Sequence, residues 1–158
     1  MCYTLHTTPN VCYIINTNHF IVAQESSGNM PKTRIYIVDD SPEICSTLEK
    51  TIAFLPNISI LGVSGTVNKA IYDLAEQEPE MVILDINLPD GSGFDVLKFM
   101  KKSKAHIPIL ILTNHSTEPF RRRAQQYGAD FFFDKTNEFE NAIEVLESLS
   151  NPTQVVNL

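Results

Sequence analysis

Residues 81–93 have the sequence MVILDINLPDGSG, and this stretch decides the fold. The first four residues, 81–84, are apolar without alternation, which is typical of a strand buried on both faces of a parallel sheet. Asp85 follows that strand directly. The Pro and the two Gly residues beyond it predict a tight loop with accessible backbone carbonyls. We therefore expect an α/β fold in which Asp85 stands at the carboxyl end of a central strand.

The same alternation of strand and helix extends to both sides of this stretch. Further strands are predicted from short β-branched or apolar runs at 34–38, 58–63, 107–112 and 131–133. Helices are predicted from apolar residues at helical spacing, at about 41–55, 67–75, 92–102, 116–127 and 139–150. Five strands that alternate with five helices predict a single parallel sheet covered on both faces, with right-handed crossovers.

Capping and helix-breaking residues mark where two of these helices begin or end. Ser41 is a good N-cap, Pro42 fits the first turn, and Glu43 favours the positive end of the helix dipole. Pro56 stops this helix, and Gly128 is a natural C-cap for the fourth. The first helix is therefore expected to end before Pro56, and the fourth just before Gly128.

Length and charge limit the possible classes of function. The 158 residues suffice for one domain, and 43% hydrophobic and 20% charged residues are ordinary for a globular protein. The net charge of −7 repels phosphate backbones, so nucleic acid is not expected as a partner. No apolar run approaches the ~20 residues of a membrane helix, so no membrane partner is expected.

The first 31 residues differ from the rest of the chain. They are rich in Thr, Asn, Ser and Cys, show no clear period and contain no Lys or Arg. A secretory or mitochondrial leader would carry positive charge there, and the few cysteines favour a reducing compartment, so we expect a cytoplasmic protein. We predict a leader at 1–31 that is disordered or an extension upstream of a start at Met30, a domain at 32–150, and a short tail at 151–158.

Polar side chains stand where the predicted strands end. Asp39 and Asp40 follow the first strand, Asp85 the third and Thr113 the fourth, and Lys135 lies just beyond the fifth. In an open doubly wound sheet the ligand site lies beyond the carboxyl ends of the strands, so these groups should gather at one rim. Three carboxylates and one ammonium carry formal charges of −3 and +1, and the remaining negative charge matches one divalent cation. Oxygen ligands with open water positions favour Mg²⁺.

This rim has the groups that phosphoryl transfer needs. A cation there would let one carboxylate attack an anionic phosphoryl group, and Asp85, at the end of the central strand, is the best nucleophile. Thr113 and Lys135 can then hold the phosphoryl oxygens while negative charge develops on them.

Residues 32–150 resemble a response-regulator receiver domain, in the family of the bacterial chemotaxis regulator. The matching features, in chain order, are the acidic pair, Asp85 with its Leu-Pro and glycines, Thr113, an aromatic residue at Phe132, and Lys135. The resemblance implies a flavodoxin-like, doubly wound five-stranded parallel sheet of order 2-1-3-4-5 with five helices. It also implies that the chain is a response regulator of a two-component phosphorelay.

The resemblance implies a role for each matched residue. Asp85 would accept a phosphoryl group from a phosphohistidine on a sensor histidine kinase or phosphotransfer protein. Mg²⁺ would be held by Asp39, Asp40, Asp85 and the backbone carbonyl of Asn87. Thr113 and Phe132 would report phosphorylation to the face of the fourth helix, fifth strand and fifth helix, where an unknown downstream protein would bind. The chain would catalyse only its own phosphorylation and dephosphorylation, so we expect no enzyme acting on a separate substrate.

The chain departs from the family pattern after its lysine, where Thr136 replaces the usual proline. A non-proline cis bond costs about 2.5–4 kcal/mol, so the Lys135–Thr136 bond is predicted to be trans. Thr136 or Asn137 can cap the last helix, and Asn137 together with Glu140 fits a capping box.

Other functions of this architecture predict different residues. A phosphohydrolase with an aspartyl-phosphate intermediate needs an acid/base two residues after the nucleophile, where this chain has Asn87. A flavin-binding or purely structural domain would carry phosphate-binding loops rich in Gly, Ser and Thr rather than three carboxylates. A longer transcription factor would need a DNA-binding module, and only eight residues follow Ser150.

Several motifs also have a plainer interpretation. The Asp39-Asp40 pair alone would be a solvated turn, and Phe131–Phe133 could be simple core. Arg121–Arg123 could contact a kinase or target, although a solvated helix face is expected in so acidic a chain. A zinc-like composition, at a spacing that matches no familiar structural zinc pattern, occurs at Cys2, His6, Cys12 and His19.

Overall fold

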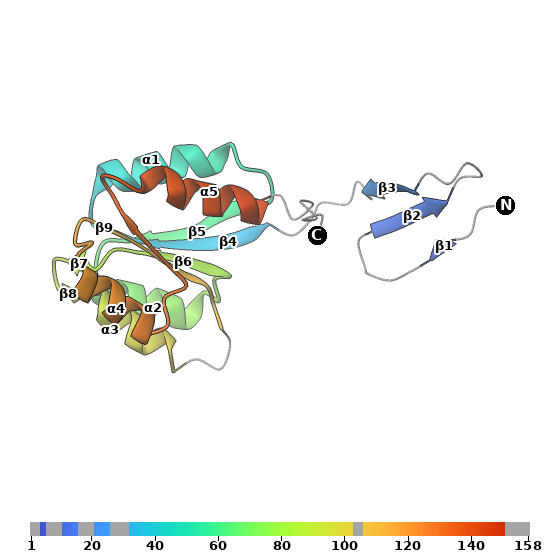
Figure 1. Ribbon diagram of the computed structural model, residues 1–158. Coiled ribbons are helices and arrows are strands. Elements are labelled where there is room, and N and C mark those ends of the chain that lie inside the picture. Colours follow the sequence, from blue (N-terminus) through green and yellow to red (C-terminus); the bar gives the residue numbers. More distant parts are fainter. Residues whose placement is uncertain (1–3, 6–10, 16–20, 26–31, 103–105, 151–158) are drawn as a thin grey trace. The chain divides into compact units, whose positions relative to one another are not determined.

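The computed structural model describes residues 4–5, 11–15, 21–25, 32–102 and 106–150 (Figure 1). The chain divides into two compact units, Met1–Pro31 and Lys32–Leu158. The second unit carries all the residues of the predicted rim and is described first.

A five-stranded parallel sheet forms the centre of the second unit. Its strands are β4 (Thr33–Val38), β5 (Ile58–Ser64), β6 (Met81–Leu84), β9 (Ile109–Thr113) and β10 (Phe131–Asp134). They lie in the order β5-β4-β6-β9-β10, and every neighbouring pair is parallel. Numbered along this unit, the order is 2-1-3-4-5, so the predicted flavodoxin-like topology is confirmed. A separate antiparallel pair is formed by β7 (Asn87–Leu88) and β8 (Gly91–Ser92).

Five helices cover the sheet: α1 (Pro42–Ala53), α2 (Val67–Glu76), α3 (Gly93–Met100), α4 (Glu118–Gln126) and α5 (Phe139–Ser150). Helices α1 and α5 lie on one face of the sheet, and α2, α3 and α4 lie on the other (Figure 1). The Ser41 side chain accepts a hydrogen bond from the Ile44 N–H, so the predicted cap of α1 is confirmed. Gly128 has a φ of +90° just beyond α4, a left-handed conformation that suits a residue without Cβ.

The central strands are apolar on both faces because each face packs against helices. In β4, Tyr36 and Val38 belong to the core cluster beneath α2, α3 and α4, whereas Ile35 and Ile37 belong to the cluster beneath α1 and α5. All four side chains are fully buried. Burying a large apolar side chain contributes about 1.5–3 kcal/mol, so this strand helps to hold both helical layers. The unbroken apolar run of β6 has the same cause.

The segment between β10 and α5 agrees with one sequence prediction and departs from another. The Lys135–Thr136 bond is trans, and no cis peptide bond occurs in the described part of the chain. In place of the capping box expected from Asn137 and Glu140, Oδ1 of Asp134 accepts the N–H groups of Thr136 and Asn137, at 2.9 Å each. Asp134 is fixed by β10, and a charged carboxylate accepts a hydrogen bond more strongly than an amide oxygen does.

The described residues of the first unit form three short strands, β1 (Thr4–Leu5), β2 (Val11–Ile15) and β3 (Ile21–Glu25). They pair antiparallel in the order β1-β2-β3. The polar composition of residues 1–31 predicted no regular structure, whereas the structure has a small sheet there. The overall composition of residues 1–31 hides two short runs, β2 and β3, that are rich in β-branched and aromatic residues. Such residues favour strands. That the leader is an upstream extension stays a prediction.

A chain that begins at Met30 should be as stable as the full chain. The reason is that residues 32–150 contain both core clusters of the sheet. Thermal unfolding of the two chains, followed by circular dichroism, measures the difference. A loss of several kcal/mol in the free energy of unfolding would show instead that the leader stabilises the domain.

Candidate functional site

Each strand of the parallel sheet ends in, or is followed directly by, a polar side chain that folds back on the chain. In every case an oxygen of that side chain accepts a hydrogen bond from the N–H group two residues further on. The accepting residues are Asp39, Ser64, Asp85, Thr113 and Asp134, and all five are buried. These turns satisfy a free N–H group after each strand, so one rim of the sheet collects five buried polar groups.

Three carboxylates meet at the carboxyl ends of β4 and β6. One oxygen from each of Asp39, Asp40 and Asp85 lies within 4.8 Å of the other two. Asp39 and Asp85 are buried, whereas Asp40 is exposed. The N–H of Asp85 donates to the Val38 carbonyl at 2.8 Å, which ties the central strand end to β4. The structure thus brings together the acidic residues that the sequence placed at one rim.

Lys135 neutralises part of this negative charge. Its Nζ lies 2.7 Å from Oδ2 of Asp39 and 2.7 Å from Oδ2 of Asp85. Burial alone would lower the pKa of Lys135, but the two carboxylates outweigh it and the pKa is raised. The ammonium is therefore charged at neutral pH. Burial also raises the pKa of Asp39, and the contact with Lys135 opposes that rise.

The acidic cluster stays negatively charged although Lys135 contacts it. Oδ1 of Asp39 accepts the Ser41 N–H at 2.9 Å, and its enclosed Oδ2 has the ion pair with Lys135 at 2.7 Å. Two carboxylate charges about 4 Å apart repel by roughly 4 kcal/mol at an effective dielectric of 20. Three carboxylates and one ammonium, −3 plus +1, leave the cluster negative. This set of oxygen donors fits a hard divalent cation.

Thr113 and Phe132 lie on the same side of the sheet. Phe132 pairs with Ile111, two residues before Thr113 on β9, and residues two apart on a strand share a face. Thr113 is fully buried, and Phe132 is half-buried against the cluster beneath α2, α3 and α4. Phe131 and Phe133 pack against the opposite cluster. The Phe run therefore serves the core of both faces, and only Phe132 lies on the side of Thr113.

The loop after Asp85 is held at two points. Asn87 is exposed, and its N–H donates to Oδ1 of Asp85 at 3.2 Å. Asp90 caps α2, because its Oδ1 accepts the Val67 N–H at 2.7 Å and its Oδ2 the Asn68 N–H at 3.0 Å. The bonds from Asn68 and Val67 lower the pKa of Asp90. Sequence reasoning assigned Asp90 no role, because a cap 22 residues away leaves no local signal.

Gly93 lets α3 begin directly against the end of the central strand. A Cβ at this position would lie 2.1 Å from the carbonyl oxygen of Asp85 and 3.0 Å from Cα of Ile86. The N–H of Gly93 donates to the Ile86 carbonyl at 2.8 Å. The second glycine of the loop is therefore required for a close approach of two backbone segments, and not only for a turn.

The three consecutive arginines have separate partners. Arg121 pairs with Glu138, Arg122 pairs with Glu118 at 3.3 Å, and the guanidinium of Arg123 lies 4.4 Å from the ring centre of Phe94. Arg122 and Arg123 are exposed, as expected for a solvated helix face. That expectation is wrong for Arg121, which is partly buried because its partners lie on β10 and beside α5.

Two further expectations concern other regions. Of the zinc-like set, Cys2, His6 and His19 lie outside the described residues. Within the described ranges, no helix combines the length and the apolar character needed to cross a membrane.

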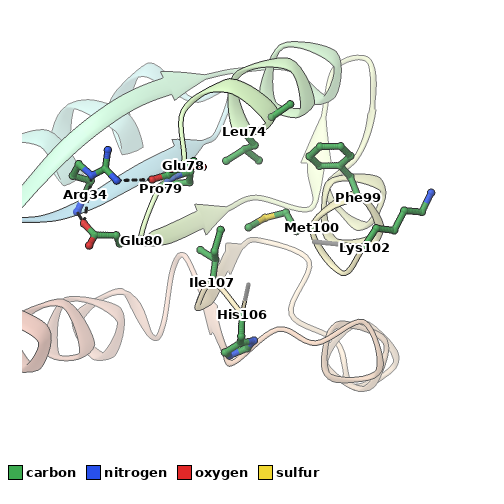
Figure 2. A pocket seen from close by; sticks show the side chains of 11 residues that line it. Arg34, Leu74, Glu78, Pro79, Glu80, Phe99, Met100, Lys102, His106 and Ile107 are labelled. Atoms are coloured by element: carbon green, nitrogen blue, oxygen red, sulfur yellow. Dashed lines mark hydrogen bonds and ion pairs between the residues drawn. The ribbon is translucent and has the colours of Figure 1, made fainter. Parts of the chain in front are cut away.

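A cavity of about 770 Å³ lies at the opposite end of the sheet (Figure 2). At its edge Arg34, near the start of β4, donates to the Glu78 carbonyl at 2.8 Å and pairs with Glu80 at 3.5 Å. Its apolar wall includes Leu74, Phe99, Met100 and Ile107. Because these residues stand at the amino ends of strands or the far ends of helices, the cavity is remote from the acidic rim, and we assign it no ligand.

Known proteins resemble this chain in sequence and in fold. The family model of the response regulator receiver domain matches residues 35–147. The regulatory protein LuxO of Vibrio cholerae is 32% identical over 98 residues, which cover 58% of this chain and only 22% of that protein. The response regulator domain of Thermotoga maritima CheB superposes with a TM-score of 0.67 at 22% identity, covering 80% of this chain and 99% of that one. The Mn²⁺-bound form of response regulator Rcp1 superposes with a TM-score of 0.63 at 20% identity, covering 80% of this chain and 98% of that one.

The family match extends over nearly all of the second unit, from β4 into α5. The two solved structures, at 22% and 20% identity, are alike in fold. Membership follows from the sequence match itself, and the chain belongs to the response regulator receiver domains of two-component systems.

Proposed function

We propose that this chain accepts a phosphoryl group on Asp85 from a phosphohistidine of a sensor histidine kinase or phosphotransfer protein, in a Mg²⁺-dependent reaction. The observation that carries the proposal is the position of the Asp85 carboxylate. It is buried at the rim, 2.7 Å from the Lys135 ammonium and grouped with Asp39 and Asp40. Burying charged groups is costly, and perturbed, clustered ionisable groups are concentrated at functional sites.

The Mg²⁺ ion would be held by Asp39, Asp40, Asp85 and the backbone carbonyl of Asn87. The net negative charge of the cluster, three carboxylates against the one ammonium of Lys135, supports this assignment. Mg²⁺ usually keeps several waters, and the exposed position of Asp40 leaves room for them. The bound ion would neutralise charge between the nucleophile and the incoming phosphoryl group. Rcp1, a protein of the same fold, has a Mn²⁺-bound form.

The attacking atom would be an oxygen of the Asp85 carboxylate, of which Oδ1 accepts the Asn87 N–H at 3.2 Å and Oδ2 accepts from the Lys135 ammonium at 2.7 Å. As the new P–O bond forms, the P–N bond to the donor imidazole breaks and the imidazole nitrogen keeps the electron pair. Lys135, which donates to Oδ2 at 2.7 Å, would then bind a phosphoryl oxygen. The Thr113 hydroxyl would bind another.

The chain would act on no separate substrate. Asn87 stands two residues after Asp85, where a hydrolase of this type would need an acid/base, and an amide does not exchange protons at neutral pH. Loss of the phosphoryl group would therefore be a slow reaction of the chain itself with water. The output would be a protein contact at the face formed by α4, β10 and α5, in the cytoplasm, with neither nucleic acid nor membrane as a direct partner.

Phosphorylation of the wild-type chain tests this function. The chain is incubated with Mg²⁺ and either acetyl phosphate or a histidine-phosphorylated transfer protein, and its intact mass is followed. A mass increase of one phosphoryl group is expected, which a chelator prevents and added Mg²⁺ restores. No mass increase with either donor would contradict the proposal.

Asp40→Asn should weaken Mg²⁺ binding by about tenfold or more. One of three carboxylates is lost, and each tenfold change in affinity needs only about 1.4 kcal/mol. Because Asp40 is exposed, the fold should tolerate the change. Titration calorimetry is the suitable measurement, since the chain has no Trp to report binding by fluorescence. Asp95→Asn, at an exposed carboxylate paired with Lys98 at 2.9 Å on α3, is the matched control and should bind Mg²⁺ like wild type.

A further inference from the structure

Arg121 of α4 contacts the loop just before its own helix and two segments further along the chain. Its Nη1 donates to the Phe132 carbonyl of β10 at 3.0 Å, and its Nε donates to the Ser116 carbonyl at 3.3 Å. Its Nη2 donates to Oε2 of Glu138, just before α5. The guanidinium carbon lies 4.8 Å from the centre of the Phe132 ring. One side chain therefore joins α4, β10 and the start of α5.

Two carboxylates extend this network towards the acidic rim. Oε2 of Glu138 also accepts the Asp134 N–H at 2.8 Å, and Oδ2 of Asp134 accepts the Ser116 hydroxyl. The bond from Arg121 is the main cause of the lowered pKa of Glu138, and the bond from Ser116 is the main cause of the lowered pKa of Asp134. Both groups are ionised at neutral pH, so the loop after β9 and the end of β10 are held together by charge-assisted bonds.

We propose that Arg121 restrains Phe132, and with it the face formed by α4, β10 and α5, in the arrangement of the unphosphorylated chain. The proposal rests on the phosphoacceptor function of Asp85. If phosphorylation draws in the Thr113 hydroxyl and Phe132 moves in response, the ring must leave the guanidinium. Arg121 would then make its contacts in one state only, and such contacts bias the equilibrium toward that state. Arg121 is thus a positioning residue that acts through Phe132.

The direction in which the affinity for a phosphoryl mimic changes distinguishes this role from that of a structural staple, meaning a contact that only holds the fold together. A staple present in both states stabilises both, so its loss leaves the binding of a phosphoryl mimic unchanged or weaker. A contact present only in the unphosphorylated state opposes the mimic, so its loss tightens binding. Cation–π contacts and ion pairs of this partly exposed kind predict a gain of about two- to fivefold in affinity.

The experiment measures the affinity of beryllofluoride, with Mg²⁺, for Arg121→Gln and Arg122→Gln by NMR. Arg122 is the matched control, an adjacent and exposed arginine that pairs with Glu118 at 3.3 Å. Arg121→Gln should bind the mimic about two- to fivefold more tightly than wild type. The signals of β10 and α4 in its free form should move toward their bound positions. Arg122→Gln should behave as wild type does. An unchanged or weaker affinity of Arg121→Gln would overturn the proposal.

Two further variants keep the test decisive if Arg121→Gln does not fold. Glu138→Gln removes the charge that holds Arg121 but keeps an oxygen for the Asp134 N–H, and should tighten binding less, in the same direction. Arg121→Lys keeps the charge without the planar stacking group and should fall between Arg121→Gln and wild type.

A failure of the phosphoacceptor function would be visible separately. In that case no protein, wild type included, would bind beryllofluoride. The restraint is then judged from the free proteins: a moved Phe132 ring signal in Arg121→Gln supports it, and a ring signal identical to that of wild type overturns it.

Discussion

Asp85→Asn should abolish phosphorylation and leave the chain folded. The amide oxygen carries no negative charge with which to attack phosphorus, yet it can still accept the Asn87 N–H that Oδ1 of Asp85 accepts at 3.2 Å. The lost attraction to Lys135 is offset by the lost repulsion from the neighbouring carboxylates. We therefore expect the free energy of unfolding to change by about 2 kcal/mol or less.

Intact mass after incubation with a phosphodonor measures the first expectation, and thermal unfolding measures the second. Asp95→Asn serves as the control and should become phosphorylated normally, because its exposed carboxylate pairs with Lys98 on α3 and is not one of the three carboxylates of the acidic cluster. Asp85→Ala removes the turn as well as the charge and should be less stable than Asp85→Asn. Uptake of a phosphoryl group by Asp85→Asn at the wild-type rate would mean that another side chain is the acceptor.

Gly93→Ala should destabilise the chain by about 3 kcal/mol or more, although alanine is the better helix former. The added Cβ would lie 2.1 Å from the Asp85 carbonyl oxygen, and 3.0 Å from the Asp85 carbonyl carbon and from Cα of Ile86. These are backbone atoms, which cannot turn away as a side chain can. The strand end must move, and the Asp85 carboxylate moves with it. The phosphorylation rate should therefore fall in whatever fraction of the protein still folds.

Gly91→Ala, two positions earlier in the same loop, is the matched control. There the Cβ would meet Cγ2 of the Val67 side chain at 3.3 Å, and that side chain can yield by a few tenths of an ångström. The free energy of unfolding should stay within about 1 kcal/mol of wild type. Urea unfolding of both variants measures the difference, and equal losses in the two would show that the close approach at Gly93 does not govern stability.

Local patterns predicted most of the fold, because the two-sided burial of parallel strands is visible in sequence. The strand at 81–84 was predicted with its observed bounds, Met81–Leu84. The fourth strand was predicted from 107, whereas it begins at Ile109. Its apolar run is continuous, but Pro108 has no N–H to donate to a neighbouring strand, and apolar character alone does not reveal this.

The rim could be predicted because it requires only strand bounds and a parallel topology. Asp39 and Asp85 meet, and Thr113 ends β9 at the same rim, because parallel strands end at the same edge. The cap from Asp90 and the network of Arg121 could not be predicted in the same way. They join residues 22 and 17 positions apart, on different elements, and depend on how α2 and α4 pack on the sheet. No period or spacing in the sequence carries that information.

In the aspartate turns at the strand ends, one carboxylate oxygen stabilises the turn and the other is left to contact groups of the rim. In Asp39, Asp85 and Asp134, Oδ1 accepts a bond from the following chain, while Oδ2 faces Lys135 or Ser116. The fold needs only one acceptor atom at each strand end, and Ser64 and Thr113 supply it without a charge. A duplicated gene for this chain could therefore lose its phosphoryl chemistry through one nucleotide change, from an aspartate to an asparagine codon, and keep its scaffold. Such an inactive copy would still present the same surface and would compete with the active one for its protein partners.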